Sequence, residues 1–357
     1  MEKKKKASRP PQRKLKPKNL TFLKDFKFLF FRTLFVLLLF GGGFFALDRS
    51  LGWGLQAALR HVRTPRVDIG VINQALSTDA NAYILGDSRA QYHYIPKILA
   101  QATGLKFFNA GLKGRELDYV RFMGDLLLQT RHPDLLLVDL SFHNFDQSRP
   151  HPLTPMLHLA LPYAAVSQAM KTYPYPTLSR LSQVYGYQDL WMALGMQLRY
   201  GKSQLTWSER FQTDYLKPGR TRPLLTGDID KRVVGELLAF IQQCHASQVR
   251  VVFCISPTYR GETEFGLWSQ EIKYLNLIRQ IAKLSQIPLI EVTETHYPQF
   301  RDYRYYSDPA HLNAAGALLY SQLVAEHLKI VLDLPDQAAL QHSIYYPSLN
   351  PSQYLRW

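Results

Sequence analysis

The stretch YILGDSRA, residues 83–90, joins an apolar segment to a turn at Gly86-Asp87-Ser88 and then to a polar segment with helical spacing. Two interpretations of its serine are open. Ser88 can cap the helix that follows, which is a common role of serine. It can also be a nucleophile at the carboxyl end of a buried strand, where open α/β sheets keep their active sites. The second interpretation requires a base, an acid that orients the base, and oxyanion donors elsewhere in the chain.

Apolar runs and helical patterns alternate from residue 80 onward, which predicts an α/β protein. Several runs are continuous rather than alternating, as is typical of parallel strands covered on both faces. We expect strands at 82–85, 106–109, 135–140, 250–255 and 289–292, and helices at 91–102, 116–129, 228–246, 269–285 and 313–328. This order predicts a three-layer, doubly wound sheet of about five parallel strands, whose strand-to-helix turns converge on one edge.

The first 47 residues predict a basic tail and a membrane anchor. Residues 1–27 hold eleven Lys or Arg and two acidic residues, so most of the net charge of +15 lies there. Residues 28–47 contain a single charge, Arg32, and are long enough to cross a bilayer. Bulky Phe44 and Phe45 disfavour a signal-peptide cleavage site, so the span is expected to stay uncleaved. By the positive-inside rule the tail is cytoplasmic and the chain after about residue 48 is exported. The alternative is a buried core helix behind a nucleic-acid-binding arm.

Changes in composition predict the remaining boundaries. We expect a juxtamembrane linker at 48–80, one main domain at 81–332 and a poorly ordered tail at 333–357. Residues 145–227 interrupt the domain with a segment that is rich in Tyr, Pro, Leu and Met and has no clear strand. Such an insertion predicts a lid, a substrate groove or a membrane-facing cap. Two packing helices that extend the core are the alternative.

A motif near the other end of the chain supplies the groups that a nucleophile needs. In YSDPAHLNAAG, residues 306–316, Asp308 precedes His311 by three residues on a turn that leads into a helix. This spacing lets the carboxylate accept a hydrogen bond from one imidazole nitrogen while the other nitrogen faces a nucleophile. Taken alone the match is weak, because Asp308 can form the turn and His311 can be an ordinary residue at a helix start.

Together, the two motifs resemble the SGNH, or GDSL-type, hydrolase superfamily of serine esterases and acyltransferases. The resemblance covers roughly residues 81–330 without the insertion. It implies a flavodoxin-like fold in which Ser88 is the nucleophile and Asp308 and His311 complete a catalytic triad.

The resemblance also implies an oxyanion hole. Its donors would be the backbone N–H groups of Ser88 and of Gly111 in FFNAGLKG, and the side chain of Asn144 in LVDLSFHNF. The chain departs from the family at residues 142–145, which read FHNF where glycine, any residue, asparagine and aspartate are usual.

Arg89 is a second departure, because the family commonly has leucine at this position. Membrane-anchored members that modify cell-surface polymers often carry a polar residue there. Arg89 is therefore a candidate for binding an anionic substrate, such as a phosphate- or uronate-bearing polymer. The alternative is a solvated arginine at a helix start.

These expectations lead to a function. We expect a membrane-anchored, extracytoplasmic serine acyl-esterase or O-acyltransferase that acts on a cell-envelope or exported polysaccharide through an acyl-serine intermediate. In a Gram-negative organism the domain would be periplasmic. The resemblance implies a multi-spanning membrane acyltransferase as a partner. The alternative function is a non-catalytic polysaccharide-binding or assembly protein with the same fold.

The sequence predicts no metal, no cofactor and no nucleic-acid partner. His93, His143 and His245 lack the spacing of metal ligands and are expected to be surface or packing residues. The basic tail has neither interleaved aromatic residues nor a recognition module.

Overall fold

The computed structural model describes residues 19–64, 68–146, 182, 184, 190–200, 228–259 and 269–333. The start of the basic tail, most of the predicted insertion and the tail from residue 334 lie outside the described residues.

Five parallel strands form the central sheet, in the order β2-β1-β3-β4-β5. They are β1 (Ala82–Leu85), β2 (Phe107–Asn109), β3 (Leu135–Asp139), β4 (Arg250–Ile255) and β5 (Leu289–Glu291). This confirms the predicted parallel sheet, and the order is that of flavodoxin-like folds. The winding reverses between β1 and β3, and such a switch point is where doubly wound sheets bind their ligands.

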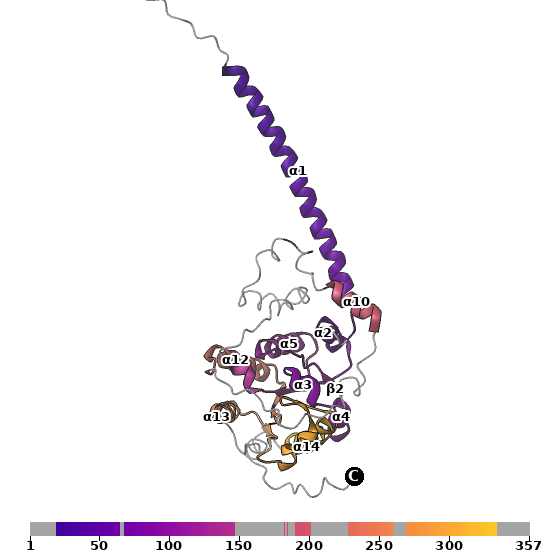
Figure 1. Ribbon diagram of the computed structural model, residues 1–357, viewed down its shortest axis with the longest axis vertical. Helices are drawn as coiled ribbons and strands as arrows, with labels where there is room; N and C mark the ends of the chain where they lie inside the picture. Colours follow the sequence, from indigo (N-terminus) through magenta and orange to yellow (C-terminus); the bar gives the residue numbers. More distant parts are fainter. Residues whose placement is uncertain are drawn as a thin grey trace, which may run out of the picture.

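Helices cover both faces of the sheet (Figure 1), which confirms the three-layer prediction. Tyr83 and Leu85 of β1 face one helical layer, whereas Ala82 and Ile84 face the other, because strand side chains alternate. The first layer contains α2 (Asp68–Ser77), α5 (Leu117–Thr130), α12 (Lys231–Ala246) and α13 (Ser269–Leu284). The second contains α4 (Pro96–Thr103) and α14 (Ala314–Asp333).

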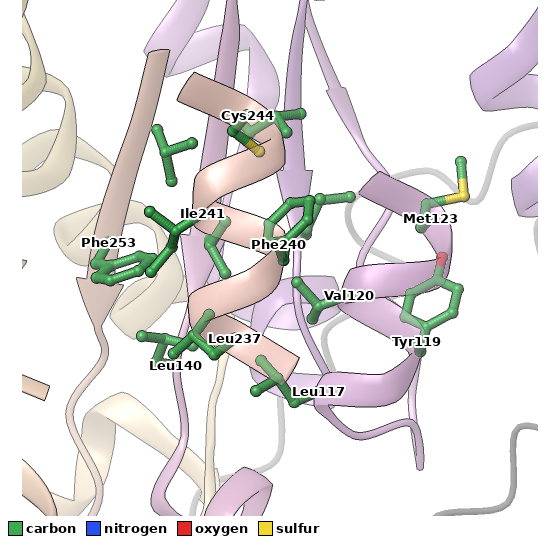
Figure 2. Close-up of a cluster of buried hydrophobic side chains, with 14 of the residues drawn as sticks. Leu117, Tyr119, Val120, Met123, Leu140, Leu237, Phe240, Ile241, Cys244 and Phe253 are labelled. Atoms are coloured by element: carbon green, nitrogen blue, oxygen red, sulfur yellow. The ribbon is translucent and has the colours of Figure 1, made fainter. Parts of the chain in front are cut away.

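Helices α5 and α12 pack closely in the first layer. Figure 2 shows Val120 of α5 beside Phe240 of α12, within one buried cluster that includes Phe253 of β4. Gly124 makes this approach possible, because a Cβ there would lie 2.2 Å from the Phe240 ring. The two helices therefore form one apolar cover over the middle of the sheet.

Helix α1 (Asn19–Leu59) stands away from the sheet (Figure 1). Its residues 26–55 are apolar and long enough to cross a membrane, and none of the segment's most apolar part is buried. At about 1.5 Å per residue this segment measures about 45 Å, more than the roughly 30 Å of a hydrocarbon core. The helix is thus longer than the predicted span of residues 28–47.

Described parts of the insertion contact the carboxyl-terminal half of α1 and the residues after it. Asp48 accepts hydrogen bonds from the Ser182 hydroxyl at 2.6 Å and from the Val184 N–H at 3.2 Å. Gln197 of α10 (Leu190–Tyr200) accepts the Thr64 N–H at 2.9 Å. These parts of the insertion therefore lie where α1 meets the domain.

Two further expectations differ from the structure. The predicted linker at 48–80 contains α2, whose Val71 and Ile72 belong to the core, so the folded unit begins before residue 81. The predicted helix at 91–102 is two helices, α3 (Ser88–His93) and α4. They separate because Ile95 precedes Pro96 and takes extended backbone angles, as residues before proline usually do.

Candidate active site

Ser88 is the first residue of α3 and follows the turn that ends β1. Gly86 makes this turn possible, since its φ is +150° and a Cβ there would lie 2.7 Å from the Ala90 Cβ. Asp87 is the capping residue, because its Oδ1 accepts the Arg89 N–H at 2.7 Å. The interpretation of Ser88 as the helix cap is therefore wrong.

The hairpin of β6 (Tyr306–Asp308) and β7 (His311–Leu312) brings an imidazole to Ser88. His311 Nε2 lies 2.7 Å from Ser88 Oγ, and His311 Nδ1 lies 2.8 Å from Asp308 Oδ2. Asp308 Oδ1 accepts the backbone N–H groups of Ala310 and His311, at 2.8 and 3.0 Å. The structure thus brings together the three residues that the two motifs singled out, with the carboxylate fixed by its own turn.

The pKa of Asp308 lies below its ordinary value. Burial favours the neutral carboxyl, but the hydrogen bond and charge of His311 and two backbone N–H groups outweigh burial and lower the pKa. Asp308 is therefore an anion at neutral pH. An anionic Asp308 holds the hydrogen on His311 Nδ1 and leaves the Nε2 lone pair for the proton of Ser88.

Gly111, a predicted oxyanion donor, lies against α3. A Cβ at Gly111 would lie 2.5 Å from the Gln91 nitrogen, so only glycine permits this approach. The Gly111 N–H donates to Asn109 Oδ1 at 2.9 Å, and Asn109 Nδ2 donates to the Ala90 carbonyl at 2.8 Å. The predicted donor is next to the helix that begins at Ser88, but its hydrogen is engaged. An anionic oxygen is a stronger acceptor than a neutral amide and can compete for it.

Asn144 does not have the environment that was predicted for it. It lies in the 3-10 helix η1 (Phe142–Phe145), is fully buried, and accepts the Ser141 N–H on its Oδ1 at 2.7 Å. Its Nδ2 donates to Glu116 Oε2 at 3.0 Å. Asn144 therefore connects the turn after β3 to the start of α5, and this geometry does not support the oxyanion role.

Arg89 also differs from both interpretations of its role. It is 3 % exposed, so it is neither a solvated arginine nor a group that faces a polymer. Its Nε donates to Ser256 Oγ at 2.9 Å, and a terminal guanidinium nitrogen donates to the Ser256 carbonyl. Burial alone would lower the pKa of Arg89, but the carboxylates of Asp139 and Asp87 outweigh burial and raise it. Arg89 is a buried cation inside the fold.

A polar network surrounds this cation beneath the site. The Ser141 hydroxyl donates to Asp87 Oδ2 at 2.7 Å, which ties the turn after β3 to the turn before Ser88. The Tyr94 hydroxyl donates to Asp139 Oδ2 at 2.6 Å and lies 2.8 Å from the Tyr320 hydroxyl. This network was not predicted from the sequence. One signal was present, an aspartate inside the apolar run 135–140.

Asp139 gives the folded state an unusual pH dependence. Burial, opposed by the charge of Arg89, raises the pKa of Asp139 from 3.8 to about 6. Between these values the folded state binds more protons than the unfolded chain, so stability falls as pH rises. The Asp139 contribution is complete below about pH 4 and is lost as pH rises through about 6, an effect of about 3 kcal/mol.

We therefore expect Asp139→Asn to flatten the decline in the free energy of unfolding between about pH 4 and about 7, as measured by urea titration. Asp125→Asn is a matched control outside the site, because burial also raises the pKa of Asp125 to about 6. An unchanged slope in Asp139→Asn would contradict the shifted pKa.

The three histidines that the sequence left aside have different environments. His245 is exposed, His143 is half-buried against Phe142, and His93 is fully buried beside His311. In the part of the chain that the structure describes, no group of three or more His, Cys, Asp or Glu could hold a metal ion.

The strand order and the proximity of Ser88, His311 and Asp308 agree with what the sequence resemblance implies. Ser88 follows β1 at the switch point, and the Asp308–His311 turn precedes the last described helix. The chain has a doubly wound, flavodoxin-like α/β fold. The turn after β3 differs from what the resemblance implies, because its Asn144 is buried and donates to Glu116.

Comparisons with known proteins gave matches among solved structures alone. No family model and no curated protein matches the chain. An acetylxylan esterase from Geobacillus stearothermophilus is 9% identical, with a TM-score of 0.39, over 72% of this chain and 96% of that one. Esterase EstA from a Pseudoalteromonas species is 13% identical, with a TM-score of 0.39, over 71% and 100%. A lipase/acylhydrolase from Enterococcus faecalis is 10% identical, with a TM-score of 0.36, over 70% and 95%.

Proposed function

We propose that this chain is a serine esterase or acyltransferase that works through an acyl-Ser88 intermediate. One observation carries the proposal: Ser88 Oγ lies 2.7 Å from His311 Nε2, and Asp308 holds the opposite nitrogen at 2.8 Å. A serine hydroxyl is a weak nucleophile until an adjacent base accepts its proton. This arrangement supplies that base and fixes its tautomer.

The proposed reaction has two steps. Ser88 Oγ attacks the ester carbonyl carbon while His311 Nε2 takes the hydroxyl proton. As the ester bond breaks, the departing alcohol oxygen receives that proton and the acyl group stays on Ser88. Water or an acceptor hydroxyl then attacks the acyl carbon of acyl-Ser88 while His311 Nε2 takes its proton. The bond between that carbon and Ser88 Oγ breaks, and His311 returns the proton to Ser88 Oγ. The N–H groups of Ser88 and Gly111 would stabilise the oxyanion in both steps, by about 3 kcal/mol per donor.

A non-catalytic polysaccharide-binding or assembly protein is the second candidate function. It is favoured by the oxyanion side of the site, where the Gly111 N–H donates to Asn109 and the Asn144 amide is engaged with Ser141 and Glu116. A protein that has lost its chemistry could keep the triad geometry while these donors serve the fold.

Reaction with an activated acyl ester and with a fluorophosphonate separates the two candidates. If the chain is an esterase, mass spectrometry of the tryptic peptide should find the acyl or phosphonyl group on Ser88, and the wild-type protein should hydrolyse a p-nitrophenyl ester. An unmodified Ser88 in folded protein, without ester hydrolysis, would leave the binding protein as the better description.

We also propose that α1 anchors the domain outside the cytoplasm. Its apolar segment and the basic residues before it support this proposal. An external domain would meet envelope or exported polysaccharides, and acyl groups made in the cytoplasm would reach it through a multi-spanning membrane acyltransferase.

This topology predicts a protease result. Protease added to spheroplasts should digest the chain after Asp48 and spare a tag at the amino terminus, because the tag would lie behind the membrane. A cleaved chain without α1 in the soluble fraction would instead identify the helix as a removed signal. Digestion of the tag would reverse the orientation.

Whether water or a sugar hydroxyl receives the acyl group depends on how the acceptor is held. We propose transfer to a polysaccharide, with the insertion 145–227 forming the acceptor groove, because an acceptor bound at high effective concentration competes with water. We expect the side chain of Trp191 or of Trp207 to stack on sugar rings. Trp207 lies outside the described residues, and the Trp191 side chain is not described. Adding soluble oligosaccharide to the ester assay should divert acyl groups to sugar, and an unchanged yield of free acid would favour hydrolysis.

A further inference from the structure

His93 is a buried imidazole that the proposed mechanism does not use. It is the last residue of α3, five residues after Ser88, and it is fully buried. Its ring meets the His311 ring edge-on, with centroids 6.3 Å apart, and lies 6.0 Å from the Tyr320 ring. His93 is therefore packed against the ring of His311, the candidate base.

The hydrogen bond of His93 defines its protonation state. Its Nε2 accepts the backbone N–H of Leu312 at 3.1 Å, which requires a lone pair on that nitrogen. The ring is thus neutral, with its hydrogen on Nδ1. Burial, followed by the charges of Arg89 and His311, lowers the pKa of His93 well below its ordinary value and maintains this neutral form.

This bond joins the two elements that carry the reacting pair. Ser88 begins α3, which His93 ends, and Leu312 is the residue next to His311 in β7. The His93 carbonyl in turn accepts the Ser321 hydroxyl at 3.1 Å, and Ser321 Oγ accepts the Ile95 N–H at 2.9 Å. The end of α3 is therefore fixed to α14 on one side and to β7 on the other.

Packing alone does not account for a histidine here. Among the described residues, His93 Nδ1 has no hydrogen-bond partner. Buried polar groups are nearly always hydrogen-bonded, so an unpaired N–H is unfavourable, and an apolar side chain would fill the space without it. What an apolar side chain cannot provide is the acceptor for Leu312.

We propose that His93 is a positioning residue, whose Nε2 holds the Leu312 backbone so that His311 stays within hydrogen-bond reach of Ser88. This inference rests on the proposed function of the site. Displacing a reacting group by about 1 Å can lower the rate about 100-fold. Losing one backbone hydrogen bond next to His311 is therefore expected to lower the rate.

Three substitutions test the acceptor. The amide oxygen in His93→Gln can reach the position of Nε2, whereas the amide in His93→Asn is one methylene shorter, and His93→Leu has no acceptor. We expect the rate of Ser88 phosphonylation by a fluorophosphonate to fall about 10- to 100-fold in the Asn and Leu variants, and the Gln variant to recover most of the wild-type rate. With a small soluble ester, kcat should fall in the same order while KM stays unchanged. If the Leu variant fails to fold, the Gln and Asn variants carry the comparison.

Two further readouts distinguish positioning from other roles. The pH profile of phosphonylation should keep its midpoint in all variants, because neutral His93 contributes no charge. A shifted midpoint would show that His93 titrates with the pair and would overturn the inference, as would equal rates in the Gln and Asn variants. Hydrogen exchange of the Leu312 amide should accelerate in His93→Asn even if Ser88 is unreactive. Unreactive wild-type protein would overturn the proposed function, whereas unchanged exchange at Leu312 would overturn the anchor itself.

Discussion

Ser88→Ala is expected to lower ester turnover by at least about 10³-fold while the protein keeps its fold. Ser88 Oγ lies 2.7 Å from His311 Nε2 and is therefore placed to attack a carbonyl while this nitrogen accepts its proton. The hydroxyl has no capping role, since Asp87 caps α3, so its removal costs the helix little. The measurement is kcat/KM for a p-nitrophenyl ester, with the thermal unfolding midpoint as the check on folding.

The same reasoning extends to the other two members of the triad. His311→Ala should be about as damaging as Ser88→Ala, and the double variant should be no worse, because residues that act as one unit are not additive. Asp308→Asn should also lose activity, because an amide in place of the carboxylate favours the wrong tautomer of His311. Wild-type turnover in Ser88→Ala would remove the basis for an acyl-Ser88 intermediate.

Arg89→Met is expected to destabilise the fold by about 3–5 kcal/mol, because it leaves buried carboxylates without a compensating charge. Methionine keeps much of the length of the side chain but removes the positive charge that Asp87 and Asp139 interact with. Arg89→Lys is the matched control, since it keeps the charge and loses the forked contact with Ser256. Urea unfolding at pH 7 measures all three proteins.

A double-mutant cycle identifies the cause of that loss. Adding Asp139→Asn to Arg89→Met removes a carboxylate that has lost its counter-charge, so part of the lost stability should return. Purely additive losses would show that Arg89 acts through packing. A loss below about 1 kcal/mol in Arg89→Met would contradict the buried cation altogether.

The strands of this protein were predictable because parallel strands buried on both faces read as continuous apolar runs. The strands at 82–85 and 250–255 were predicted with their observed bounds, and the other three differ by one residue at one end. Proline and its local geometry account for the split of the helix predicted at 91–102. The buried helix α2 was missed because its ten residues follow a long apolar helix, and composition alone suggested a linker there.

The site was predictable where its chemistry is local. Asp308 and His311 are three residues apart on one turn, so the sequence itself contains their geometry. Arg89 was misinterpreted because its partner Ser256 is 167 residues away, and nothing near Arg89 in the sequence signals burial. The role of Asn144 depends on Glu116, the residue before α5, and the neutral state of His93 depends on Leu312. Contacts between residues so far apart in sequence can be identified only when the arrangement of the strands is known.

The distance in sequence between Ser88 and His311 has a consequence for biosynthesis. Ser88, the proposed nucleophile, is made 223 residues before His311, its proposed base. Domains are completed from the amino terminus as the chain is synthesised. Throughout that interval the serine has no general base, so a nascent or prematurely terminated chain that carries α1 and Ser88 would be unable to cleave or transfer an ester. The proposed activity therefore requires synthesis at least as far as the hairpin that carries His311.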